Sequence, residues 1–111
     1  MRSPSIIPDF DIDVYLVLDD FGKLGRAYRE TDEEASDRDT VVRNLISGEY
    51  KKPVRVVAFN TSEGWARDVT EDTARAVIDE AQRSGSLLYG AVVDFVERAT
   101  GEIVPPSLLD A

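Results

Sequence analysis

The chain has 111 residues and a formal net charge of −9, from 22 acidic and 13 basic side chains. This length is typical of one domain, and it can bury enough apolar surface to fold without covalent cross-links. The sequence contains no cysteine and no histidine. That composition excludes disulfides and thiolate metal sites, and it removes both the usual general base near neutral pH and the commonest metal ligand.

Acidic side chains gather toward both ends of the sequence. Residues 1–20 carry five acids and one base, residues 21–67 carry eight and nine, and residues 68–111 carry nine and three. A net negative charge opposes binding to the polyanionic backbone of nucleic acid. The sequence has neither the roughly 20 consecutive apolar residues of a membrane span nor a basic and then apolar leader. We therefore expect a cytoplasmic protein that does not enter a membrane.

The first predicted element is a hairpin. Residues 1–10 hold two prolines and are expected to form a loose N-terminal arm. From Ile12 to Leu18 both faces of the alternating pattern are apolar, which predicts an inner strand. The segment from Asp19 to Lys23 is rich in turn residues, and the more polar segment 24–30 then returns as a second strand.

A helix is predicted next, from about residue 33 to about residue 47, because apolar residues recur there at helical spacing. The segment from Thr31 to Glu34 matches the capping-box pattern. The charged first half of the helix favours a later start, at Ser36 or Asp37, as the alternative. Gly48 suits the left-handed conformation that ends many helices.

The central prediction is a buried strand over residues 54–59, the most β-prone apolar run in the chain. Pro53 suits its first position, where no ladder hydrogen bond is required. Three helix N-cap candidates follow in succession, namely Asn60, Thr61 and Ser62. The strand is therefore expected to lead directly into a short helical turn at residues 63–67.

Two more helices are predicted in the last part of the chain. Thr70 is a further N-cap candidate, and the apolar spacing predicts a helix from about residue 71 to about residue 83. A last helix is predicted from about residue 87 to about residue 99, and Gly101 ends it. Residues 102–111 are expected to form a C-terminal tail.

This ββαβαα order predicts a single α+β domain over residues 1–111, with two layers and the helices packed on one face of a small three-stranded sheet. A hairpin that is joined through a crossover helix to a third strand implies a mixed sheet. The order of the strands stays open.

Paired carboxylates follow the first predicted strand, at Asp19 and Asp20. Such a pair can bind Mg²⁺ or perform acid–base work. The alternative is a hairpin turn with solvated acids, and no further acid or lysine lies at a spacing that completes a recognised site.

A candidate anion site lies after the central strand, at Asn60, Thr61 and Ser62 with assistance from Arg67. Free N–H groups and the helix dipole attract anions at the start of a helix. The alternative is plain N-capping, since no phosphate-loop pattern accompanies these residues.

A candidate interaction surface lies on the predicted hairpin, because arginine and tyrosine are favoured at interface hot spots. Its members are Arg26, Tyr28 and Arg29, together with Arg55 on the predicted neighbouring strand. A solvated sheet face with cross-strand ion pairs explains them equally well. Trp65 is either a stacking residue or hot spot, or a partly buried core anchor.

The helix at residues 87–99 has an apolar arc wider than one core contact needs. One edge can cover the sheet, and the other includes Tyr89, Val93 and Val96. An exposed patch of this kind predicts a homodimer or another protein partner that docks on this helix. The alternative is a helix that the preceding helix or the tail shields within one chain.

Two segments, from Val17 to Glu30 and from Pro53 to Val69, resemble a group of small alphaproteobacterial proteins with no assigned function. The resemblance covers roughly residues 14–85. It implies a bacterial cytoplasmic origin and carries no information about catalytic residues. The last helix and the tail lie outside it.

Three functional hypotheses follow. The absence of histidine, cysteine and a catalytic constellation favours a non-enzymatic binding or regulatory module, with no cofactor and no metal. The second hypothesis is a small-anion-binding protein or weak enzyme that uses the corner at residues 60–67. The third is nucleic-acid binding through the hairpin arginines, which the acidic balance opposes.

Overall fold

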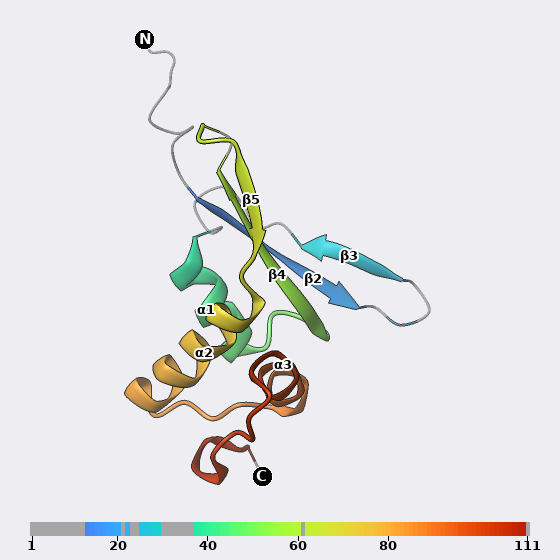
Figure 1. Cartoon of the computed structure of the whole chain (residues 1–111). Coiled ribbons are helices and arrows are strands. Elements are labelled where there is room, and N and C mark those ends of the chain that lie inside the picture. Colours follow the sequence, from blue (N-terminus) through green and yellow to red (C-terminus); the bar gives the residue numbers. More distant parts are fainter. Residues whose placement is uncertain (1–12, 21, 23–24, 30–36, 61, 111) are drawn as a thin grey trace.

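The computed structural model describes residues 13–20, 22, 25–29, 37–60 and 62–110. Figure 1 shows a twisted sheet with the helices gathered on one side of it. In chain order the elements are β2 (Val14–Asp20), β3 (Arg26–Arg29), α1 (Arg38–Ser47), β4 (Pro53–Asn60), β5 (Trp65–Asp68), α2 (Thr70–Ser84), α3 (Gly90–Thr100) and the 3-10 helix η4 (Pro106–Leu108). The α+β class and the single helical layer are confirmed.

The strands form one sheet in the order β3-β2-β4-β5, and every hydrogen-bonded pair is antiparallel. The prediction of a mixed sheet is therefore wrong. Strands β3 and β4 do run in the same direction, as a crossover helix implies, but β2 lies between them and pairs with both. The predicted hairpin and the inner position of β2 are confirmed.

The chain does not enter a helix after β4, as the sequence predicted, but turns back into β5. The Asn60 side chain accepts the Glu63 N–H at 2.9 Å, and the Asn60 carbonyl accepts the Gly64 N–H at 2.9 Å. These bonds close a hairpin turn, and Trp65 then pairs with Asn60 across the ladder. The predicted helical turn at residues 63–67 is wrong, and the observed order is ββαββαα.

The helices begin and end close to the predicted residues. Asp37 is the N-cap of α1, because its carboxylate accepts the Thr40 N–H at 2.8 Å, and this bond lowers the pKa of Asp37. The later of the predicted starts is thus the observed one, and the capping-box segment 31–34 lies outside the described residues. The N-cap of α2 is Val69, with no side-chain cap bond. Among the described residues, no helix is long and apolar enough to cross a membrane.

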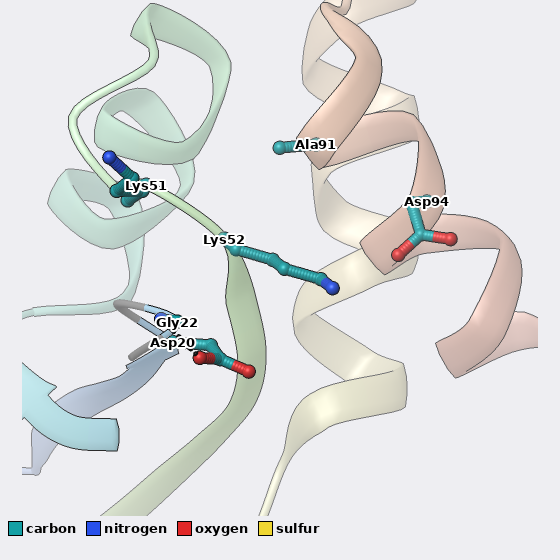
Figure 2. A pocket seen from close by; sticks show the side chains of 6 residues that line it. All are labelled: Asp20, Gly22, Lys51, Lys52, Ala91 and Asp94. Carbon is teal, nitrogen blue, oxygen red and sulfur yellow. Dashed lines mark hydrogen bonds between the residues drawn. The ribbon is translucent and has the colours of Figure 1, made fainter. Parts of the chain in front are cut away.

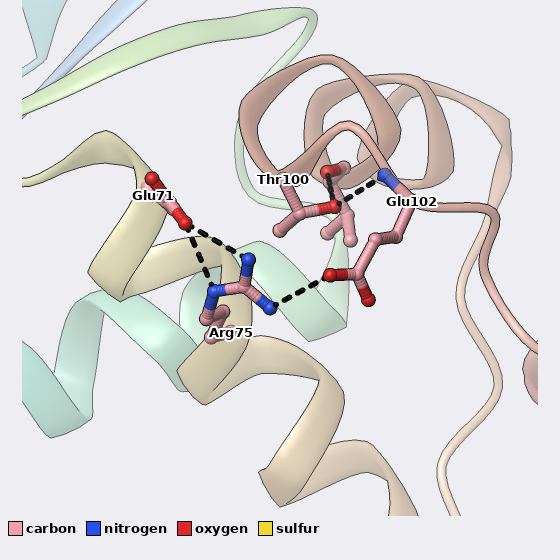
Figure 3. A network of polar contacts seen from close by, with 5 residues as sticks. Glu71, Arg75, Thr100 and Glu102 are labelled. Atoms are coloured by element: carbon pink, nitrogen blue, oxygen red, sulfur yellow. Dashed lines mark hydrogen bonds and ion pairs between the residues drawn. The ribbon is translucent and has the colours of Figure 1, made fainter.

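Helix α3 begins at Gly90, later than the predicted start at about residue 87, because the residues before it pair with the C-terminal tail. Leu88 forms a parallel bridge with Leu109, and its N–H donates to the Leu108 carbonyl at 2.7 Å. The tail therefore lies against the start of α3. Figure 3 shows a second attachment, in which Arg75 of α2 donates to Glu71 at 2.8 Å and to Glu102 of the tail at 3.4 Å.

The hydrophobic core lies between the sheet and the helices. Its largest buried side chains come from both layers and from the tail: Val17, Val41, Leu45, Val56, Val77, Leu88, Val92, Phe95, Val96 and Val104. Since alternate residues of a strand point to opposite faces, β2 and β4 each supply one set of side chains to this core. The other set lies on the face of the sheet that no described helix covers (Figure 1).

Candidate functional site

A cleft of about 600 Å³ lies between α3 and the segment that leads into β4. Its walls come from parts of the chain that are distant in sequence: Asp20, Gly22, Lys51, Lys52, Ala91 and Asp94. Figure 2 shows the Lys52 side chain extending across the space toward α3, with Asp20 below it and Asp94 beyond it. A volume of roughly 300–1,000 Å³ is the range that small-molecule sites occupy.

A buried carboxylate holds the segment that carries the two lysines. Asp19 has a relative exposure of 0%. Its Oδ2 accepts the Lys51 N–H at 2.9 Å, and its Oδ1 accepts the Lys52 N–H at 2.7 Å. The Asp20 N–H donates to the Lys52 carbonyl at 3.0 Å. Since charge-assisted hydrogen bonds are strong, these bonds fix where the two lysine side chains leave the backbone.

Helix α3 is joined to the same segment at two points. The Tyr89 hydroxyl donates to the Tyr50 carbonyl at 3.1 Å, and Arg98 donates to the Pro53 carbonyl at 3.3 Å. Burial raises the pKa of Tyr89, and the nearby charges of Asp19 and Glu49 raise it further. The two walls of the cleft are therefore bonded to each other at both ends.

The carboxylates of the cleft are already engaged. Asp94 accepts from Arg98 at 2.9 Å, one helical turn further along α3. Asp20 accepts the Gly22 N–H at 2.8 Å and pairs with Arg26 at 3.4 Å. The Gly22 bond is the main cause that lowers the pKa of Asp20, and the charges of Arg26 and Lys52 act in the same direction.

The ammonium groups, in contrast, are available. Within the described part of the chain, neither the Lys51 nor the Lys52 side chain forms an ion pair or hydrogen bond, and both residues are exposed. Ala91 lies in the first turn of α3, whose N-cap Tyr89 makes no side-chain cap bond. Ala91 and Asp94 line the cleft along one side of α3, so the two lysines are the groups of the cleft that can attract an anion.

The structure separates the residues of the predicted anion corner from any helix start. Asn60 is buried and turns the β4–β5 hairpin, while its amide donates to Asp13 at 3.1 Å. Ser62 is exposed in that turn, and Thr61 lies outside the described residues. The Arg67 guanidinium lies 4.7 Å from the centre of the Trp65 ring. The physical reason for expecting an anion there, a free helix N-terminus, is absent from this hairpin.

The predicted interaction residues lie on separate elements. Arg26, Tyr28 and Arg29 are on the edge strand β3, whereas Arg55 is on β4, beyond β2. Arg55 pairs with Asp68 at 3.4 Å, as the cross-strand alternative expected. Trp65 is packed against the core, which agrees with its interpretation as a partly buried anchor.

The apolar arc of α3 is largely covered by the protein's own chain. Val96 is fully buried, and Tyr89 and Val93 are partly buried against the core. Val104 and Leu108 of the tail are buried beside them. This arrangement matches the alternative in which the tail shields the helix.

The sequence interpretation missed the two cleft lysines and Asp94. One signal was present, because the chain has only three lysines and Lys51 and Lys52 are adjacent in an acidic sequence. The third, Lys23, lies outside the described residues. Asp19, which the sequence placed in a turn or a magnesium site, instead organises the lysine segment from within the core.

Comparisons with known proteins do not indicate a function, which leaves the geometry of the cleft as the basis for one. No protein-family model, curated protein or solved structure matches the chain. Among the described residues, no group of three acidic, histidine or cysteine side chains is placed to hold a metal ion. The cleft between α3 and the lysine segment is the feature that points to a ligand.

Proposed function

We propose that the protein is a non-enzymatic binding module for a small anion, such as a molecule with a carboxylate or phosphate group. The ligand lies in the cleft between Lys51, Lys52 and the start of α3. The observation that carries the proposal is a pair of ammonium groups that form no ion pair or hydrogen bond with any described residue, on a segment that buried Asp19 holds in place. A site that is ordered before binding loses less entropy when the ligand arrives.

The charges of the cleft favour a compact ligand with few negative groups. Two ammonium groups attract the anion. Asp20 and Asp94 stand at the rim and repel a ligand whose negative charge extends beyond the lysines. This arrangement supports a small metabolite rather than an extended polyanion such as nucleic acid, in keeping with the net charge of −9.

The side chains of the cleft favour binding over catalysis. Its carboxylates accept hydrogen bonds from Gly22, Arg26 and Arg98, and the bonds to Asp20 favour its ionised form. General acid–base catalysis works best with a pKa near the operating pH, and the pKa of Asp20 is instead lowered. The described lining residues also include no serine, threonine or cysteine nucleophile.

The test is an amide NMR titration of the full chain with inorganic phosphate and, separately, with citrate. We expect the amide signals of Gly22, Lys51, Lys52 and Ala91 to shift in a saturable manner at millimolar ligand. The amides of residues 62–67 serve as an internal comparison, because the earlier anion hypothesis places the ligand there. Saturable shifts at residues 62–67 alone would move the site to the hairpin.

The matched variants are Lys51→Gln/Lys52→Gln and Arg38→Gln/Arg67→Gln, which remove the same charge from different places. We expect the lysine variant to lose the titration and the arginine variant to keep it. Cleft amides that do not move with either anion would rule out the proposed function. Equal losses in both variants would show that only the overall charge matters.

A further inference from the structure

The face of the sheet that the described helices leave uncovered is apolar at its centre. Five side chains form it, and each keeps part of its surface accessible: Val14, Leu16 and Leu18 of β2, and Val57 and Phe59 of β4. The ladder places them side by side, since Val14 pairs with Phe59 and Leu16 pairs with Val57. We call these five residues the open face.

An inner strand that is apolar on both sides is typical of a sheet that is covered on both sides. In β2 the core face is supplied by Tyr15 and Val17, while Leu16 and Leu18 point the other way. The described helices all pack on the core face (Figure 1). A contiguous apolar patch of this kind marks an interaction surface.

We propose that the open face is the interface of a homodimer, in which two copies stack sheet against sheet. Two antiparallel sheets pack well in this manner at a separation of about 10 Å. A twofold axis would make the interface self-complementary. The dimer would have four layers, with the helices of each copy on the outside.

The distribution of charge identifies a second copy as the partner. The whole chain has a net charge of −9, so two copies repel each other at most orientations. On the side of the sheet that carries the open face, however, the ladder places two arginines and two aspartates, namely Arg26, Arg55, Asp20 and Asp68. The described strand residues on this side of the sheet therefore carry no net charge, so two copies can meet there without strong repulsion.

The charged residues around the open face are also complementary to themselves. Arg55 pairs with Asp68 at 3.4 Å, and Arg26 pairs with Asp20 at 3.4 Å. Arg55 and Asp68 lie next to the apolar centre, because Arg55 is paired with Leu18 and Asp68 with Val57. A surface with an apolar centre and a rim of both signs fits an identical surface after a twofold rotation.

The proposal is independent of the anion cleft, because none of the five open-face residues lines the cleft and only Asp20 belongs both to the cleft and to the rim of the open face. It also differs from docking on α3, whose apolar arc is largely covered within one chain. Failure of the anion titration would thus leave the dimer proposal unchanged. A monomer in the sedimentation experiment would likewise leave the anion proposal unchanged.

The test is sedimentation equilibrium of the full chain from low to high micromolar concentration. We expect a monomer–dimer equilibrium that Arg55→Glu weakens by at least about tenfold, a change that corresponds to 1.4 kcal/mol. The double swap Arg55→Glu/Asp68→Arg restores a neutral rim, so it should recover most of the dimer. The control is Arg83→Glu, which breaks the exposed Glu80–Arg83 pair on α2 and should leave the equilibrium unchanged.

Intermolecular NOEs in a mixture of labelled and unlabelled chains give a readout that needs no variant. The methyl groups of Leu16, Leu18 and Val57 should show contacts to the other copy. A monomer at all concentrations overturns the proposal. A dimer that lacks these contacts, or that Arg55→Glu and Arg83→Glu weaken equally, overturns it as well.

Discussion

A single buried carboxylate determines where the cleft lysines lie. Asp19 has no access to solvent, and burial of a charge is unfavourable unless hydrogen bonds satisfy it. The N–H groups of Lys51 and Lys52 supply two such bonds. The neighbouring Asp20 has the same side chain, but its bonds to Gly22 and Arg26 lie at the surface. Two adjacent aspartates thus have different roles because alternate strand residues point to opposite faces.

We predict that Asp19→Ala destabilises the protein by about 3 kcal/mol, since it leaves two N–H groups without their acceptor. The matched variant is Asp20→Ala, which removes surface bonds and should cost clearly less. Urea denaturation followed by circular dichroism measures both. Equal costs for the two variants would show that the Lys51–Lys52 segment does not depend on Asp19.

Helices α1 and α2 each end at a glycine, a feature that is visible in the sequence. One of these two glycines also has a second structural role. Helix α1 ends at Gly48, with a φ of 86°, and α2 ends at Gly85, with a φ of 72°. A β-carbon at Gly48 would lie 3.2 Å from the Tyr89 ring, whereas one at Gly85 would meet nothing within 4 Å. Gly48 therefore ends a helix and also makes room for the residue that precedes α3.

We predict that Gly85→Ala costs about 1–2 kcal/mol, the penalty for a side chain in the left-handed region. Gly48→Ala should cost more than that, because it adds a close contact with the Tyr89 ring. Thermal or urea unfolding of the two variants gives the comparison. If both variants lose the same stability, Tyr89 moves aside at no measurable cost.

The sequence predicted the elements whose signals are local. Two apolar runs, one of them over residues 54–59, gave the central strands, and Asp37 and Gly48 gave the ends of α1. The β5 strand was missed because Asn60 has the same chemistry in a hairpin turn as at a helix N-cap: its side-chain oxygen accepts a backbone N–H from a residue further along. The side chain of Asn60 alone therefore does not distinguish a hairpin turn from the start of a helix.

At the scale of the whole molecule, the cleft was beyond prediction because it is assembled from three distant segments. Asp20, Lys51 and Asp94 come from β2, the loop before β4, and α3. Their meeting depends on the order β3-β2-β4-β5, which the sequence left open. The attachment of the tail, through the bonds from Leu88 to Leu108 and from Val104 to Glu97 of α3, is equally a long-range result.

Two of the four phenylalanines, Phe59 and Phe95, lie among the described residues, and they occupy different layers of the fold. Phe95 of α3 has a relative exposure of 1%, whereas Phe59 lies on the open face and is only partly buried. We predict that Phe95→Ala costs about 3–5 kcal/mol and Phe59→Ala clearly less. Guanidinium unfolding at low protein concentration, where a dimer dissociates, measures the monomer. A Phe59→Ala cost as large as that of Phe95→Ala would place Phe59 in the core of a single chain.

The short outer strands of the sheet have a consequence for aggregation. Both β3 and β5 are four residues long, and their exposed members include Arg26, Arg67 and Asp68. Short, charged outer strands are how natural sheets avoid strand-by-strand growth into fibrils. The central strands β2 and β4, which carry the apolar runs, have both of their hydrogen-bonding edges occupied. A folded chain therefore offers no long apolar strand edge within its described sheet as a template for amyloid growth.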